Sequence, residues 1–172
     1  MTNSADGDTR ILGTLASRDG KGVVRMQDRL DAPIDDVWAA LTDAGRLARW
    51  LGTVDGDFTL GGKLRAHFFD GWEGTGRVEA CEPRQHLLVV TQHDRQSYEQ
   101  VTEISLTPDG DQTRVVWEER GMTLEQVAPY GAGVQLHIED LAAHLAGRER
   151  GDAEARWKDL LPAYEELAAK LA

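Results

Sequence analysis

Hydrophobic and polar residues alternate along several short segments of the chain, with the period of two that is typical of half-buried β-strands. In residues 23–30, Val24, Met26 and Leu30 share one face, and Asp28 falls on that face by parity. Residues 11–15 are either a short strand or part of an N-terminal arm. Further strands are expected over residues 54–58, 63–69, 72–82, 86–92, 98–106 and 113–120. Short turns between successive strands predict an antiparallel meander.

Other segments repeat their hydrophobic residues at helical spacing. Two short helices are predicted directly after the first strand, the first from about residue 33 to residue 41 and the second over residues 46–51, and Pro33 suits the first turn of the earlier one. After residue 121 the period changes from two to about 3.6, which predicts a long helix over residues 131–146. A further helix is expected over residues 153–171, with a kink or break near Leu161 because Pro162 follows it.

This order of elements predicts an α+β fold. A curved antiparallel sheet of about six or seven strands would wrap around the long helix, which covers the apolar face of the sheet. Space between such a sheet and its helix is a typical ligand site. The chain is expected to divide into an N-terminal arm that is disordered or loosely attached (1–19), the main domain (20–147) and an additional helix packed on it (148–172).

Charge and composition narrow the classes of partner. The 172 residues include 19 Lys and Arg against 30 Asp and Glu, a net charge of −11. That negative charge argues against nucleic acids and anionic membrane surfaces as binding partners. Cys81 is the only cysteine, so no internal disulfide can form. With no apolar run long enough to span a bilayer and no apolar signal core at the start, a cytoplasmic location is expected.

Several short motifs point to one superfamily. They are RLDAP at 29–33, VWAALTD at 37–43, LARW at 47–50, GGKL at 61–64, GRVE at 76–79 with Glu82, Pro83 and Leu87, and YGAG at 130–133. Together they resemble the START-like helix-grip superfamily (SRPBCC, birch-pollen-allergen-like), in particular its branch named after the activator of the heat-shock-protein-90 ATPase. The resemblance covers about residues 20–146 and implies an internal cavity. Where the closing helix of this family often carries a tryptophan, this chain has Val134.

The leading hypothesis is a binding protein for a small, largely apolar ligand held between the sheet and the closing helix. The following residues are predicted to line the cavity: Met26, Trp72, Val78, Trp117, Tyr130, Val134, His137, Ile138 and Leu141. Trp72 lies in a glycine-rich loop and is the best candidate for the cavity mouth. His67 alternates with Phe68 and is expected to face solvent.

The second hypothesis is an enzyme of the cyclase, dehydratase or hydrolase kind known on this superfamily. Asp28, Glu103 or His137 would act as acid or base. Asp28 has inner-face parity, whereas Glu103 shares the parity of Val101, and a bulge would decide its face. No nucleophile signature is present, and the spacing of His137, Glu139 and Asp140 on a helix does not make a metal site. No cofactor is expected.

The third hypothesis is a protein-interaction module, a co-chaperone in the manner of the family's name. The additional C-terminal helix would provide either extra packing or a homodimer contact.

Overall fold

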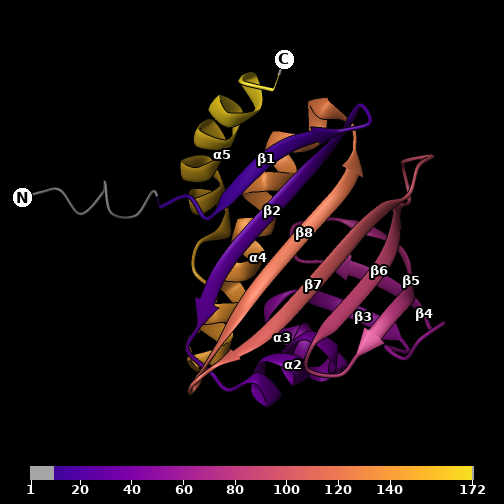
Figure 1. Cartoon of the computed structure of the whole chain (residues 1–172), viewed down its shortest axis with the longest axis vertical. Coiled ribbons are helices and arrows are strands. Elements are labelled where there is room, and N and C mark those ends of the chain that lie inside the picture. The colour runs from indigo at the N-terminus through magenta and orange to yellow at the C-terminus, as the bar shows by residue number, and fades with distance from the viewer. Residues whose placement is uncertain (1–9, 172) are drawn as a thin grey trace, which may run out of the picture.

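The computed structural model describes residues 10–171, and the described chain folds around one antiparallel sheet (Figure 1). The spatial order of its eight strands is β1-β2-β8-β7-β6-β5-β4-β3. Their bounds are β1 Gly13–Arg18, β2 Lys21–Leu30, β3 Gly52–Gly56, β4 Lys63–Phe68, β5 Glu73–Glu82, β6 His86–His93, β7 Gln100–Asp109 and β8 Gln112–Met122. The α+β helix-grip class is confirmed, but the prediction of six or seven strands is slightly wrong.

The additional strand is β1, which the sequence left open as a strand or part of an arm. Gly13–Arg18 pairs along Lys21–Met26 of β2, so this part of residues 1–19 is not a loose arm, and residues 1–9 lie outside the described chain. Two long-range hydrogen bonds fix the start of β1. The Leu12 N–H donates to Gln135 Oε1 at 3.1 Å, and the Gly13 N–H donates to the Tyr164 hydroxyl at 3.1 Å.

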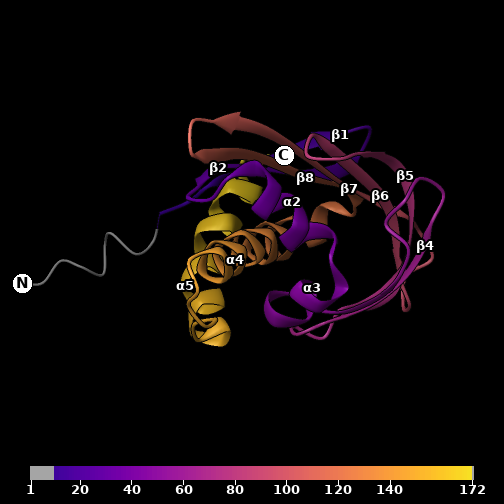
Figure 2. The same ribbon diagram turned by 90° about the horizontal axis from the view of Figure 1, so that it is seen from below.

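The long helix α4 (Val127–Leu145) crosses the concave face of the sheet, and the sheet curves around it (Figure 2). It begins four residues before the predicted start, after the short 3-10 turn η1 (Leu124–Gln126). Irregular pairing between Gly22 and Val23 and between Val78 and Ala80 gives the strands local bends.

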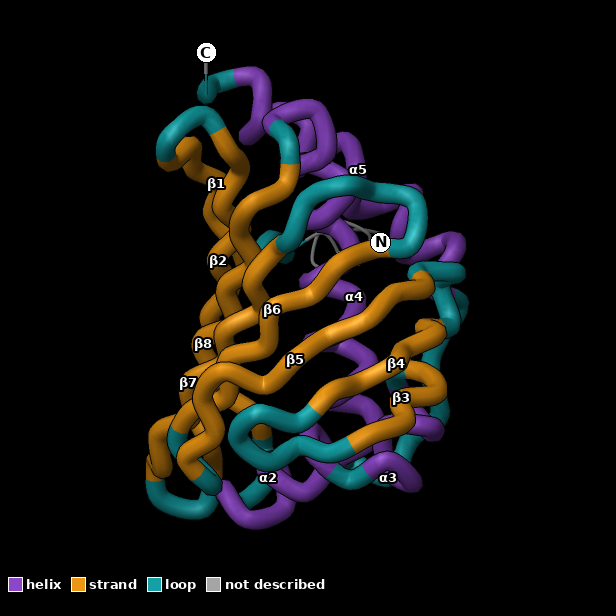
Figure 3. The backbone as a smooth tube through the Cα atoms, turned by 90° about the vertical axis from the view of Figure 1, so that its right-hand side faces the viewer, coloured by secondary structure: helices purple, strands orange, loops and turns teal. Residues whose placement is uncertain are grey.

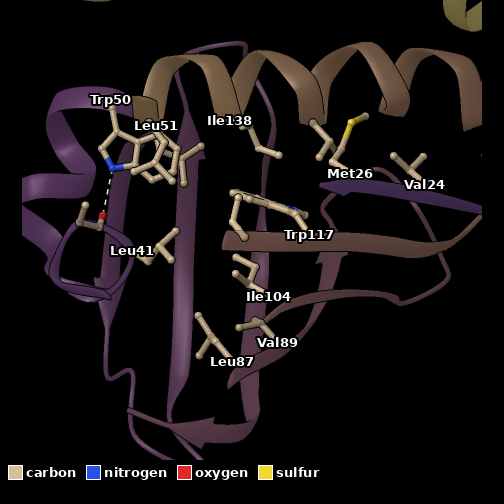
Figure 4. Packing of buried hydrophobic residues seen from close by; sticks show 14 of the residues in the cluster. Val24, Met26, Leu41, Trp50, Leu51, Leu87, Val89, Ile104, Trp117 and Ile138 are labelled. Atoms are coloured by element: carbon tan, nitrogen blue, oxygen red, sulfur yellow. Dashed lines mark hydrogen bonds between the residues drawn. The ribbon is translucent and has the colours of Figure 1, made fainter. Parts of the chain in front are cut away.

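The short helices α2 (Ile34–Thr42) and α3 (Ala44–Trp50) lie together at one end of the sheet (Figure 3). The buried Trp50 joins them, because its indole N–H donates to the Ala40 carbonyl at 3.0 Å (Figure 4). Above them, Ile138 of α4 points toward Trp117 and Ile104 on the sheet. Buried aliphatic and aromatic side chains therefore connect the helices to the strands.

The C-terminal helix α5 (Ala153–Ala169) packs on α4 and β1 through the buried Leu160 and Tyr164. The Tyr164 hydroxyl donates to Gln135 Oε1 at 2.5 Å, and burial raises the pKa of Tyr164 to about 12. The helix does not break at Pro162, because Pro162 and Lys158 lie on its exposed side, where water can satisfy the unpaired carbonyl. In residues 10–171, no helix combines the length and apolarity that crossing a membrane requires.

Candidate functional site

A cavity of about 760 Å³ lies between α4 and the inner face of the sheet. Its closed end is apolar and is formed by α2, α3 and β3, with Leu41, Leu47, Trp50, Leu51 and Val54. The lining also includes the β4–β5 and β6–β7 loops and the first turns of α4 and α5. Exposed lining residues, including Phe69, Gly71 and Glu154, mark the mouth, which lies beside α3 because the Phe69 N–H donates to the Leu51 carbonyl at 3.0 Å.

Aromatic rings form one continuous wall of this cavity, from Trp117 through His137, Phe68 and Trp72 to His93. Trp117 stacks on His137 at a centroid distance of 6.1 Å, and Phe68 stacks on Trp72 at 5.0 Å. The edge contacts of Phe68 with His137 and of Trp72 with His93 are both 5.6 Å. We call these five residues the aromatic wall. Flat apolar ligands gain both burial and ring contacts on such a surface.

Gly74 on β5 makes room for the Trp72 ring. A Cβ atom built at Gly74 would lie 2.5 Å from Trp72 Cη2 and 2.4 Å from the Gln92 carbonyl oxygen. Any side chain there would displace the indole or the neighbouring strand. The position of Trp72 in the aromatic wall therefore depends on the absence of a side chain two residues later.

The carboxyl group of Glu119 on β8 lines the cavity beside this wall. Its Oε1 accepts hydrogen bonds from Trp117 Nε1 and Thr102 Oγ1, both at 3.4 Å. Burial raises the pKa of Glu119 to about 7, the hydrogen bonds partly oppose the rise, and the Asp70 carboxylate adds to it. Glu119 is therefore a carboxyl group that can give or take a proton near neutral pH.

His137 of α4 lines the cavity on the face of the same Trp117 indole. Burial lowers the pKa of His137, although Asp70 and Asp140 act in the opposite direction. Its Nε2 lies 4.0 Å from Asp70 Oδ2. A neutral imidazole and a carboxyl group thus flank one indole inside the cavity.

Tyr130 and Gln96 provide uncharged polar groups. The Tyr130 hydroxyl donates to Gln100 Oε1 at 3.0 Å and takes part in a side-chain hydrogen bond with Trp72, and burial raises its pKa. Gln96 Oε1 is buried and has no hydrogen-bond partner among residues 10–171. Buried acceptors of this kind are costly unless a ligand or water pairs with them.

Residues 31–146 match the profile of the family described as "Activator of Hsp90 ATPase homolog 1-like protein". The chain belongs to this family. A comparison with curated protein sequences gives no significant match.

Solved structures share the fold of this family member. The crystal structure of CalU16 from Micromonospora echinospora has a TM-score of 0.76 and 22% identity, over 91% of this chain and 96% of that chain. Its solution structure gives 0.78 and 20%, with both chains covered completely. DynU16, a protein in the dynemicin biosynthetic locus, gives 0.70 and 29% over 79% of this chain and 51% of that chain.

The structure divides the predicted lining residues of this family member into two groups. Trp72, Trp117, Tyr130, Val134 and His137 do line the cavity. Met26, Val78, Ile138 and Leu141 are buried but are not among the lining residues. Met26, for example, lies beyond the cavity beside the Tyr164 hydroxyl, with its Sδ at 3.5 Å from the oxygen.

Two of the three candidate acid–base residues lie away from the cavity. Asp28 shares the face of Met26 as its parity predicts, but it lies near the sheet edge, 3.4 Å from Arg10. Glu103 is on the outer face, where it contacts His86 at 2.7 Å and Arg120 at 2.9 Å. Hydrogen bonding to His86 in particular lowers the pKa of Glu103.

Glu119 is the functional candidate that sequence reasoning missed. The sequence did indicate its inward position, because Glu119 continues the inward alternation of Val115 and Trp117 along β8. His67 faces solvent as expected, with 63% of its side chain exposed. Among the described residues, no group of three or more His, Cys, Asp or Glu side chains could hold a metal ion.

Proposed function

We propose that this protein binds a small, largely apolar molecule in the cavity between α4 and the sheet. The observation that carries the proposal is the cavity of about 760 Å³ with its aromatic wall. Sites for small molecules typically have volumes of roughly 300–1,000 Å³, with apolar linings and a few convergent polar groups. Glu119, Tyr130 and Gln96 supply such groups here.

The first experiment is native mass spectrometry of the protein as purified, which would detect a co-purifying molecule. A cavity-filling variant, Val134→Trp, gives a test by mutation, because Val134 is buried and lines the cavity. We expect Val134→Trp to lose the co-purifying mass and to abolish binding of an apolar fluorophore. The matched control is Val116→Trp, on the outer face of β8. This variant should keep both the co-purifying mass and the binding of the fluorophore.

Folding of both variants is checked by circular dichroism. Equal fluorophore binding by wild type and a folded Val134→Trp variant would contradict occupation of this cavity. Absence of both a bound molecule and fluorophore binding in the wild type would contradict the proposed function as a whole.

A second function is favoured by one specific observation, the placement of Glu119 and His137 on the same Trp117 indole. Two proton-transfer groups beside one apolar surface are what an acid–base enzyme of the cyclase or dehydratase type needs. Incubation of the co-purified molecule with the protein in D₂O tests this function. An enzyme of this kind introduces deuterium or converts the molecule, and Glu119→Gln abolishes this change. Recovery of the molecule unchanged and without deuterium identifies a binding protein.

A further inference from the structure

The charged side chains that line the cavity have one sign. Asp70, Glu119 and Glu154 are the carboxylates of the lining, and it contains no lysine or arginine from residues 10–171. Arg150 comes close to the mouth, where its guanidinium lies 4.5 Å from the Phe69 ring centroid, but it is paired with Asp140 at 3.2 Å. An anionic ligand would therefore lose its hydration without gaining a permanent cation.

The two histidines of the aromatic wall do not replace that cation. His93 Nδ1 accepts a hydrogen bond from the Arg95 backbone N–H at 2.9 Å, so this nitrogen carries no proton. His137 is enclosed between Trp117 and Phe68, and its burial favours the neutral ring. Neither imidazole therefore supplies the permanent cation that an anionic ligand would need.

Glu119 has unused capacity to accept hydrogen bonds. Both of its hydrogen bonds end on Oε1, and both are long at 3.4 Å. Within the described part of the chain, Oε2 has no hydrogen-bond partner. A ligand N–H or O–H group could therefore reach the carboxylate without displacing a protein donor.

The surroundings of this carboxylate also suit positive charge. The Trp117 indole N–H donates a hydrogen bond to Glu119. The side chains of Asp70 and Tyr130 lie close enough to Glu119 to interact electrostatically with its carboxyl group. Aromatic faces attract ammonium groups, most strongly when the site excludes water. The cavity therefore offers a cation the Glu119 carboxylate together with the aromatic rings of Trp117 and Tyr130 close to it.

We infer that the ligand is an aromatic or polycyclic amine, with its rings against Trp72 and Trp117 and its ammonium group directed at Glu119. The inference rests on the proposed binding function and adds the charge class of the ligand. Fatty acids and phosphorylated lipids are disfavoured by the same geometry.

Three probes with one ring system test the charge class: 1-pyrenemethylamine, 1-pyrenemethanol and 1-pyrenecarboxylate. Their binding is followed by pyrene fluorescence and tryptophan quenching at about pH 8, where Glu119 is ionised. We expect the amine to bind at least about tenfold more tightly than the alcohol, and the carboxylate to bind most weakly.

Glu119→Gln should bring the amine to within about threefold of the alcohol, because the variant removes the charge with which only the amine can pair. This variant keeps the shape of the side chain and removes a buried charge, so it should fold. Glu118→Gln, on the same strand with its side chain on the opposite face, is the matched control and should keep the preference for the amine. Asp70→Asn should lower the affinity for the amine less, by about two- to threefold, because Asp70 is half exposed.

Equal affinities of the wild type for all three probes would overturn the inferred charge class and leave the binding function standing. Preference for the carboxylate, or a preference for the amine that survives in Glu119→Gln, would also overturn it. If none of the three probes binds, the proposed function itself fails.

Discussion

The space between α4 and the sheet has two halves that are built differently. On one side α4 packs directly against β1 and β2, and α5 covers it further. On the other side the sheet curves away toward β4 and β5, as Figure 2 shows, and the cavity lies there. We call these the packed half and the cavity half.

The packed half is filled by large side chains and close backbone approach. Met26, Leu160 and Tyr164 are fully buried, and a Cβ atom at Gly13 would lie 2.5 Å from Met26 Cε. In the cavity half, side chains such as Trp72, Val89 and Val134 instead border an open volume of about 760 Å³. The difference supports the proposal that the cavity half binds a ligand, while the packed half contributes stability.

One helix serves both halves. Along α4, Tyr130, Gly133, Val134 and His137 recur at helical spacing and line the cavity, whereas Gln135 faces Tyr164 of α5. Substitutions along α4 can therefore separate stability from binding.

The largest expected difference is between two leucines of α4. Leu141→Ala should lower the free energy of unfolding by about 2–5 kcal/mol, because Leu141 is fully buried. Leu136→Ala should cost less than about 1.5 kcal/mol, because Leu136 is only partly buried and borders the cavity. Urea denaturation of both variants measures the difference. Equal losses would show that the two halves are not distinct in packing.

Glu119→Gln should change the pH dependence of stability. The folded-state pKa of about 7 lies above the unfolded value of about 4.5, so the folded protein keeps this proton to higher pH. Stability from this group is complete below the unfolded pKa and falls as pH rises to about 7. We therefore expect Glu119→Gln to stabilise the protein by roughly 2–3 kcal/mol relative to wild type at about pH 8, and by little at about pH 4.5.

Wild type and Glu119→Gln share the other ionisable groups on the cavity, which are Asp70, His93, His137 and Glu154. The difference in the free energy of unfolding between the two proteins therefore isolates the contribution of Glu119. Denaturation at the two pH values provides the measurement. A constant difference between the variant and wild type across this range would contradict the raised pKa.

Tyr164→Phe, in the packed half, should produce a smaller loss of stability. It leaves the Gly13 N–H without its acceptor and removes a donor to Gln135, at a cost of about 1–2 kcal/mol. Hydrogen exchange of the Gly13 amide should accelerate, while probe affinity stays unchanged. Loss of probe affinity in this variant would show that the two halves are coupled.

The periodicity of the sequence predicted most of the fold. The central strands, the two short helices and the long closing helix all lie within a few residues of their predicted bounds. Strand β1 was harder, because its position depends on hydrogen bonds to Gln135 and Tyr164, more than a hundred residues away. Propensity within residues 11–15 contains no information about those partners.

Prediction of the site had a different limit. Alternation and helical spacing tell which side chains are buried, but they do not tell a packed core from a cavity wall. Val134 and Ile138 lie on one predicted face of α4, yet only Val134 borders the cavity. Curvature of the sheet away from α4 decides between them, and curvature depends on bulges and glycines across several strands.

The most direct test of ligand binding in the cavity half is nuclear magnetic resonance with methyl-labelled protein and bound 1-pyrenemethylamine. We predict intermolecular nuclear Overhauser effects from the pyrene ring to the methyl groups of Val134 and Val89, both of which line the cavity. None should appear to Met26 or Leu160, which are buried but do not line it. Contacts to Met26, or contacts confined to surface methyl groups, would contradict the account.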